Sequence, residues 1–209
     1  MKWHSVRNLS LALLSLLCLG FAGGVVYTLL FDPEPIEIPI GGPFELIDHN
    51  GATVTDAAFR GRYMLIYFGY TYCPDVCPTK LAEMTNALDS FAERAPARAA
   101  KIVPVFISID PDRDTLAVLR EYRKHFHPRM AALTGTEATL RAVAKAYRAY
   151  FSKVYPDEKS RAAREYLMDH TSYVYLVAPD GRYVTHFTAA STADSIAERF
   201  ATTYLRKNQ

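Results

Sequence analysis

One stretch decides the fold: residues 66–78, with the sequence IYFGYTYCPDVCP. An apolar and aromatic run, typical of a buried strand, ends at Gly69, and a helical pattern begins at Pro78. Proline is favoured at the first position of a helix, so we expect Cys77 at or next to the helix N-terminus. The positive end of the helix dipole favours the thiolate, which is the form that binds soft metals and attacks disulfides. The stretch therefore predicts a strand, a turn and a helix with a reactive thiol at the corner.

The remaining chain alternates between strand and helix patterns around this unit. Asn50-Gly51 lies between two short alternating runs, residues 44–48 and 52–55, which predicts a β-hairpin. Further strands are expected at residues 62–68, 101–109, 130–133, 171–177 and 183–187, and helices at residues 78–94, 114–126, 136–150 and 192–205. Asp114 and Thr136 are the expected N-terminal caps of their helices. The charged segment of residues 155–166 is expected to be a surface excursion. This alternation indicates an α/β domain, with a central sheet and helices on both faces.

The N-terminal part of the chain is predicted to be a membrane anchor. Residues 9–31 carry no charge, and these 23 residues exceed the roughly 20 that a helix needs to span a bilayer. Positive residues occur before this segment and acidic residues directly after it, so residues 1–8 are expected in the cytoplasm and the rest of the chain on the other side. A cleaved signal peptide is the alternative, although its apolar region would usually be about 7–15 residues long. Cys18 is interpreted as a small apolar residue of the membrane helix.

A proline-rich segment follows the predicted anchor. Residues 32–41 contain prolines at 33, 35 and 39 among acidic residues and isoleucines, which is typical of a stiff, extended tether. Residues 42–209 are expected to form one domain, because no repeat, low-complexity stretch or further linker interrupts them. The net charge of +2 and the lack of a long run of Lys and Arg give no support for nucleic-acid binding.

Outside the predicted anchor, Cys73 and Cys77 are the two cysteines of the chain. Three residues separate them, one more than in the usual redox pair at a helix start. The wider gap lets both sulfur atoms face one ion, and two thiolates suit a soft, low-coordinate metal such as Cu(I). The pair could instead be a structural disulfide that closes a small loop. Tyr70 and Tyr72 flank the pair and are expected to shield it.

Three distant residues are candidates for completing the site. His170 precedes an apolar strand that could lie beside the Cys73 strand, and a neutral imidazole would complete a Cys-Cys-His site. Such a site suits copper better than zinc, since structural zinc prefers four protein ligands. Asp169 could orient the imidazole as an outer partner or be a plain turn residue. Asp110 follows a strand at the kind of end where ligands bind in α/β sheets, so it could approach the thiols; a simple turn is the alternative.

Taken together, these motifs resemble the signature of the Sco (SenC-type) copper-delivery proteins. The matching segments are residues 68–78 (FGYTYCPDVCP), 108–115 (SIDPDRDT), 127–135 and 169–181. The similarity covers roughly residues 42–204, and the predicted anchor also fits the family. The departures are mild: Thr171 stands where serine is common, and Ala132 where glycine is common.

The resemblance implies a thioredoxin-like fold with a mixed sheet, and it implies that Cys73, Cys77 and His170 bind one copper ion, as Cu(I) or Cu(II). It further implies delivery of that ion to the dinuclear copper centre of cytochrome c oxidase subunit II, or reduction of that subunit's cysteines beforehand. Other copper chaperones or thiol reductants would then be partners. On this reading the protein is a metallochaperone and not a true enzyme.

Two enzymatic functions stay open beside it. A periplasmic thiol–disulfide oxidoreductase would use Cys73 to attack and Cys77 to resolve. Oxidoreductases of this type resemble one another in placing a proline before the strand that faces the thiols, whereas His170 and its neighbours stand there in this chain, which favours metal. A peroxidase of the same fold has less support, since the sequence places no arginine beside the thiol.

The N-terminus also bears on where the protein works. It lacks the Arg- and Ser-rich stretch of a mitochondrial presequence. We therefore expect a single-pass protein of a bacterial inner membrane with its C-terminal domain in the periplasm. A mitochondrial inner-membrane protein that faces the intermembrane space is the alternative.

Overall fold

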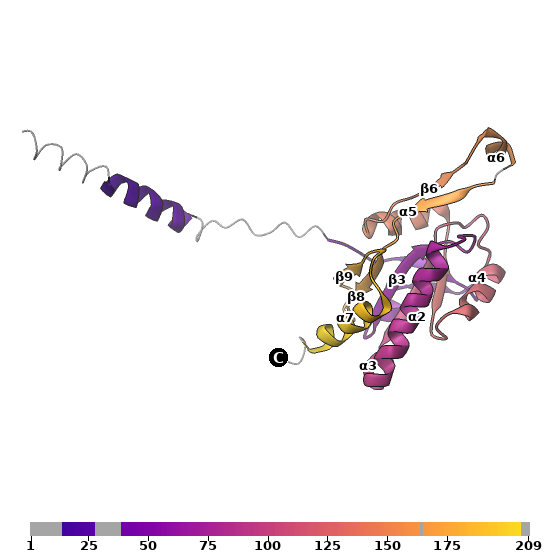
Figure 1. Cartoon of the computed structure of the whole chain (residues 1–209). Coiled ribbons are helices and arrows are strands. Elements are labelled where there is room, and N and C mark those ends of the chain that lie inside the picture. The colour runs from indigo at the N-terminus through magenta and orange to yellow at the C-terminus, as the bar shows by residue number, and fades with distance from the viewer. Residues whose placement is uncertain (1–13, 28–38, 164, 206–209) are drawn as a thin grey trace, which may run out of the picture. The chain divides into compact units, whose positions relative to one another are not determined.

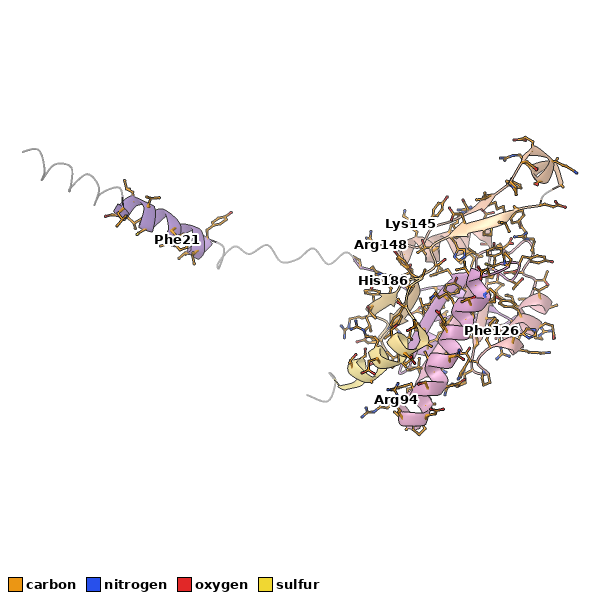
Figure 2. The ribbon with its side chains drawn as sticks, viewed as in Figure 1. Phe21, Arg94, Phe126, Lys145, Arg148 and His186 are labelled. Carbon is orange, nitrogen blue, oxygen red and sulfur yellow. The ribbon has the colours of Figure 1, made fainter. Side chains whose placement is uncertain are left out.

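The computed structural model describes residues 14–27, 39–163 and 165–205 (Figure 1). The chain divides into two units, residues 1–38 and residues 39–209. In the first unit, residues 14–27 form a helix with exposed apolar side chains, Phe21 among them (Figure 2). None of the described helices is both long and apolar enough to cross a membrane. The two ends of the predicted anchor and most of the predicted tether, residues 9–13 and 28–38, lie outside the described residues.

The second unit is built on a mixed sheet, which has seven strands in the described part of the chain. Their order is β2 (Thr53–Thr55), β1 (Glu45–Asp48), β5 (Ala131–Thr134), β4 (Ile102–Ser108), β3 (Tyr63–Gly69), β8 (Val174–Val177) and β9 (Tyr183–Phe187). β3, β4 and β5 are parallel, whereas β1, β8 and β9 pair antiparallel with their neighbours. The predicted hairpin at Asn50-Gly51 is confirmed, because β1 and β2 pair antiparallel around it. The expected mixed sheet is confirmed as well.

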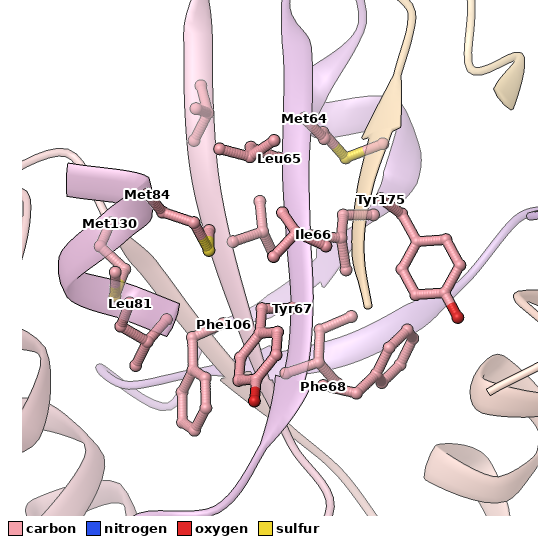
Figure 3. Close-up of a cluster of buried hydrophobic side chains, with 14 of the residues drawn as sticks. Met64, Leu65, Ile66, Tyr67, Phe68, Leu81, Met84, Phe106, Met130 and Tyr175 are labelled. Atoms are coloured by element: carbon pink, nitrogen blue, oxygen red, sulfur yellow. The ribbon is translucent and has the colours of Figure 1, made fainter. Parts of the chain in front are cut away.

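Strand β3 is buried along its whole length, which explains its unbroken apolar sequence. Successive side chains of a strand point to opposite faces of the sheet. Figure 3 shows this alternation: Tyr67 lies on the side of Leu81 and Met84, and Phe68 lies on the side of Tyr175. Leu81 and Met84 belong to α2 (Val76–Arg94), so this helix covers the face that carries Tyr67.

Helices cover both faces of the sheet, as predicted. α2 packs against α7 (Ala193–Leu205), and on the same face Tyr122 of α4 (Leu116–Tyr122) packs against Phe106 of β4, with ring centroids 5.6 Å apart. On the opposite face Tyr147, which follows α5 (Glu137–Ala146), packs against Phe68 at 5.7 Å. The short helical elements are η1 (Asp56–Phe59), α3 (Pro96–Ala99) and η2 (Arg123–His125).

The helix caps agree with the sequence in one case and differ in another. The Thr136 hydroxyl accepts a hydrogen bond from the Thr139 amide at 3.2 Å, which confirms the predicted cap of α5. The predicted cap of α4 is wrong: the hydroxyl of Thr115, not the carboxylate of Asp114, accepts from the Val118 amide at 3.3 Å. Asp114 is instead buried, because its carboxylate binds groups from the strand ends described below.

The sequence patterns do not predict a second, two-stranded sheet. It consists of β6 (Phe151–Val154) and β7 (Leu167–His170), which pair antiparallel with α6 (Glu158–Ala163) between them. Figure 1 shows this hairpin projecting from the main sheet with α6 at its far end. The predicted excursion is thus the outer part of a hairpin, and the strand expected at residues 171–177 is shortened to β8. The register places Phe151 opposite His170, so the base of the hairpin carries the candidate histidine.

Candidate metal centre

The two thiols lie where β3 gives way to α2. β3 ends at Gly69, a loop carries the half-buried Cys73, and Cys77 is the fully buried second residue of α2. The Cys77 amide donates a hydrogen bond to the Cys73 sulfur at 3.4 Å. Pro78 is therefore the third residue of the helix and not the first. The predicted position of the pair at the helix start is confirmed, with both cysteines reduced.

The buried environment of Cys77 changes its acidity. The Tyr67 hydroxyl donates to the Cys77 sulfur at 3.7 Å, and a Cβ on Gly69 would lie 3.0 Å from that sulfur. Burial raises the pKa of the Cys77 thiol to about 12. Burial therefore opposes the thiolate at Cys77, which the position at the helix start was expected to favour.

His170 meets Cys77 at the base of the β6–β7 hairpin. Its Nε2 atom lies 3.5 Å from the Cys77 sulfur. Its Nδ1 atom lies 3.2 Å from the Thr171 carbonyl, which can only accept, so Nδ1 carries the proton and Nε2 keeps its lone pair. Burial lowers the pKa of His170, which favours the neutral imidazole. A neutral imidazole with its lone pair beside a sulfur is the form that coordinates a metal.

Aromatic rings hold the imidazole in place. The edges of Tyr67 and Tyr70 meet the ring of His170, each at a centroid distance of 6.0 Å. Both tyrosines come from the end of β3 or directly after it, so the strand that leads to the thiols also supports the histidine. Tyr70 is buried and lines the pocket with Cys73, whereas Tyr72 is 59% exposed; shielding of the thiol pair stays a prediction for Tyr70 and does not fit the exposed ring of Tyr72.

Cys73 and His170 line one open pocket of about 250 Å³. Among the described residues, no three His, Cys, Asp or Glu side chains already converge on one point. Cys77 and His170 are in contact, so Cys73 has to approach them before one ion can touch all three. The loop position of Cys73, outside both strand and helix, is compatible with that movement.

The pocket also contains the candidate Asp169. It is lined by Asp169 and Asp75 and by no Lys or Arg side chain of the described residues, so its charge is negative. The charge of Asp169 favours the protonated imidazole of His170, but this effect is smaller than that of burial. The hydrogen bond of the imidazole Nδ1 goes to the Thr171 carbonyl and not to the Asp169 carboxylate. A role of Asp169 as an outer partner of the histidine stays a prediction.

Asp110 lies behind the pocket and not in it. It is fully buried and forms an ion pair with Arg113, whose Nε lies 2.5 Å from the carboxylate. The Tyr166 hydroxyl donates to the same carboxylate at 2.7 Å. Asp110 therefore binds Arg113 and Tyr166 and is not among the residues that line the pocket with Cys73.

Sequence reasoning missed Asp114 as a support of the thiol loop. Its carboxylate accepts from the Thr71 hydroxyl at 2.6 Å, from the Thr71 amide at 3.1 Å and from the Ser108 hydroxyl at 2.6 Å. It thus fixes the loop two residues before Cys73 to the end of β4. Burial raises the pKa of Asp114. Its place in the loop between the end of β4 and the start of α4 is compatible with either contact, and the sequence interpretation assigned it to a helix cap.

The fold and the pocket define a thioredoxin-like α/β protein that holds a dithiol and a histidine together. The chain belongs to the SCO1/SenC family, whose model matches residues 34–205. It is 42% identical over 164 residues to an SCO2-like protein of Rickettsia prowazekii, in an alignment that covers 78% of this chain and 77% of the relative. The human SCO1 homolog, a mitochondrial protein, is 40% identical over 163 residues, which cover 78% of this chain and 52% of the human one.

Solved structures of the family have the same fold. Arabidopsis thaliana ScoI with copper bound superposes with a TM-score of 0.71 at 36% identity, over 80% of this chain and 99% of that one. Bradyrhizobium japonicum ScoI with copper bound gives a TM-score of 0.67 at 41% identity, over 78% of this chain and 98% of that one. The recognised resemblance to the Sco proteins is therefore confirmed.

Proposed function

We propose that this protein is a copper metallochaperone that binds one copper ion through Cys73, Cys77 and His170. The observation that carries the proposal is the contact of 3.5 Å between the Cys77 sulfur and the unprotonated Nε2 of His170, next to a pocket that His170 and Cys73 line. Thiolate and imidazole together suit copper in both of its common oxidation states. Relatives of 36% and 41% identity are known with copper bound, which supports the same cargo here.

The geometry also suits release of the ion. Cys73 lies on a loop and lines an open pocket, so an incoming thiolate can replace it without entry into the core. Cys77 and His170 would hold the ion until the exchange is complete. We propose that the acceptor is the dinuclear copper centre of cytochrome c oxidase subunit II, which the family resemblance implies. Reduction of that subunit's cysteines beforehand would use the same thiols.

Copper stoichiometry of the full chain tests this proposal. The reduced protein is loaded with Cu(I) or Cu(II) and desalted, beside the variants Cys73→Ala, Cys77→Ala and His170→Ala. His186→Ala is the matched control, because His186 lies in β9 outside the pocket. We expect one copper per chain in the wild type and the control, and loss of copper in either cysteine variant. We expect His170→Ala to disturb Cu(II) more than Cu(I), because thiolates dominate the binding of the softer ion. A wild-type chain that retains no copper would contradict the proposal.

A thiol–disulfide oxidoreductase is the second candidate function. It is favoured by one observation: Cys73 is the more exposed of the two cysteines and lines the open pocket, so a partner disulfide can reach its sulfur. Cys73 would attack a partner disulfide and Cys77 would resolve the mixed disulfide. Turnover with a disulfide substrate that survives His170→Ala would support this function over copper transfer.

We further propose that residues 9–31 anchor the protein in a membrane, with the domain from residue 42 on the far side. The unbroken run of uncharged residues and the acidic residues after it support this topology. A bacterial inner membrane fits the similarity to the Rickettsia protein, and a mitochondrial inner membrane is the alternative that the human relative suggests. Membrane fractionation followed by protease treatment of intact spheroplasts tests it, with cleavage of the C-terminal domain as the expected result.

A further inference from the structure

A single guanidinium lies among three tyrosines next to the pocket. The Cζ atom of Arg113 is 3.7 Å from the ring centroid of Tyr166, 4.9 Å from that of Tyr72 and 5.8 Å from that of Tyr70. Guanidinium groups bind to aromatic faces through both charge and planar stacking. Arg113 therefore contacts aromatic side chains from two separate segments of the chain.

The two segments are the ones that carry the proposed ligands. Tyr72 directly precedes Cys73 in the thiol loop. Tyr166 directly precedes β7, the strand that ends in His170. The main sheet and the β6–β7 hairpin are separate sheets, so side-chain contacts fix the hairpin relative to the thiol loop together with the short link from β7 to β8.

Two hydrogen bonds hold the guanidinium of Arg113 in place. Its Nε atom donates to the fully buried carboxylate of Asp110, and its Nη1 atom donates to the Tyr166 carbonyl at 2.8 Å. The same carboxylate accepts from the Tyr166 hydroxyl. Three of the contacts between the Asp110–Arg113 pair and the hairpin thus converge on Tyr166: a ring stack, a backbone bond and a hydroxyl bond.

We propose that Arg113 is a positioning residue, which clamps the hairpin with His170 against the loop with Cys73 and so sets the geometry of the metal centre. The inference rests on the proposed function, because it assigns the clamp to the residues that would hold copper. Asp110 acts through Arg113 in this arrangement: it neutralises and orients the guanidinium, which accounts for a carboxylate buried behind the pocket. Arg161 stacks over Tyr155 at 4.8 Å and reaches the clamp only through that ring, which packs against Tyr166 at 5.7 Å.

Hydrogen exchange in the metal-free full chain tests the clamp without copper. The reporters are the amides of the hairpin base, including the Thr171 amide, which donates to the Tyr150 carbonyl at 2.9 Å. In Arg113→Gln we expect these amides to exchange at least tenfold faster, with amides of β3 and β4 unchanged. Arg161→Gln is the matched control, since it removes an Arg–Tyr stack from the same hairpin away from the thiols; its hairpin-base amides are expected to exchange as in the wild type.

Two further variants keep the test decisive. If Arg113→Gln fails to fold because Asp110 is left buried without a counter-charge, the double variant Asp110→Asn/Arg113→Gln removes both charges and takes its place. Arg113→Lys keeps the positive charge but not the planar stack, so the amides of its hairpin base are expected to exchange fast as well. Wild-type exchange in Arg113→Lys or in the double variant would overturn the clamp.

A copper readout connects the clamp to the metal centre. When the Arg113→Gln chain or the double variant is loaded with Cu(II), a fraction of the molecules is expected to show the Cu(II) spectrum of His170→Ala. The number of Cu(I) ions bound per chain is expected to equal that of the wild type. A Cu(II) spectrum identical to that of the wild type would overturn the positioning role. If the wild type itself binds no copper, the proposed function fails, and the exchange experiment still decides whether Arg113 fixes the hairpin.

Discussion

Gly69→Ala tests the close packing around Cys77. A Cβ at Gly69 would lie 2.9 Å from the Tyr67 ring, 3.0 Å from the Cys77 sulfur and 3.0 Å from the Phe106 ring. Ordinary contacts of a Cβ begin at 3.4 Å, so the neighbouring side chains would have to move away by about 0.5 Å. All three are fully buried, and their displacement therefore spreads into the core. The φ angle of Gly69 is not in the left-handed region, so the cost comes from overpacking and not from backbone strain.

The expected loss of stability follows from that crowding. Overpacking a well-packed core by one methyl group costs about 1–3 kcal/mol. In a domain of this size each kcal/mol lowers Tm by about 2–4 °C, so we expect a fall of roughly 2–12 °C. Thermal unfolding of the metal-free chain measures the fall, and the Cu(II) spectrum of the loaded chain reports the displaced sulfur.

Gly42→Ala is the matched control for this experiment. Its Cβ would meet only the Ala146 Cβ at an ordinary 3.8 Å, and the φ angle of Gly42 is not positive. Replacing such a glycine by alanine is expected to leave stability unchanged or raise it by up to about 1 kcal/mol, because it restricts the unfolded chain. If Gly69→Ala melts and binds copper like Gly42→Ala, the tight contact of β3 with Cys77 does not exist and the reasoning is refuted.

Three other substitutions give separate tests. Asp114→Ala leaves the buried Ser108 hydroxyl without its acceptor. Because each lost hydrogen bond to a carboxylate costs about 1.5–3 kcal/mol, we expect the free energy of unfolding in urea to fall by about 2–4 kcal/mol. A fall below about 1 kcal/mol would contradict the support role of Asp114. Tyr67→Phe removes the hydroxyl that donates to Cys77, so Cu(I) binding in a chelator competition is expected to weaken by about 1 kcal/mol, roughly fivefold, and unchanged affinity would contradict it. Burial lowers the pKa of His127. The contribution of the buried, neutral imidazole to stability is therefore fully present above about pH 6.5 and is lost as pH falls through the folded-state pKa. The free energies of unfolding of His127→Gln at pH 7.5 and at pH 5 are expected to differ by less than those of the wild type. An equal difference would speak against the lowered pKa of His127.

The sequence predicts the main sheet well because its signals are local. The apolar run of β3, the Asn50-Gly51 turn and the capping threonine of α5 each act over a few residues, and each is present in the structure. The β6–β7 hairpin is different, since its strands have four residues each and their sequences, FSKV and LMDH, show no alternation of apolar and polar residues. Short strands of this kind are defined by their pairing, which sequence periodicity does not show.

The same distinction applies to the metal centre. Cys73 and Cys77 are evident from their spacing and their place before a helix. The residues alone offer His170 as a candidate, from its place before an apolar strand, and the family resemblance selects it, because 93 residues separate it from Cys77. Asp114 was assigned to the wrong contact, since a carboxylate after a strand end can cap a helix or turn inward, and only the tertiary structure decides between the two.

The burial of Cys77 bears on the choice between copper transfer and disulfide exchange. A thiol with a pKa of about 12 is almost wholly protonated at neutral pH, so it is a slow nucleophile. In disulfide exchange it would have to resolve the mixed disulfide formed by Cys73, and that step depends on its thiolate. A metal ion, in contrast, supplies the positive charge that the buried site lacks, and a coordinating thiol gives up its proton to it. The unprotonated Nε2 of His170 beside the sulfur adds a neutral ligand without adding a charge that would have to be buried. The same burial that hinders Cys77 as a resolving thiol therefore leaves it well suited to hold a cation, and this favours copper binding as the main task of the site.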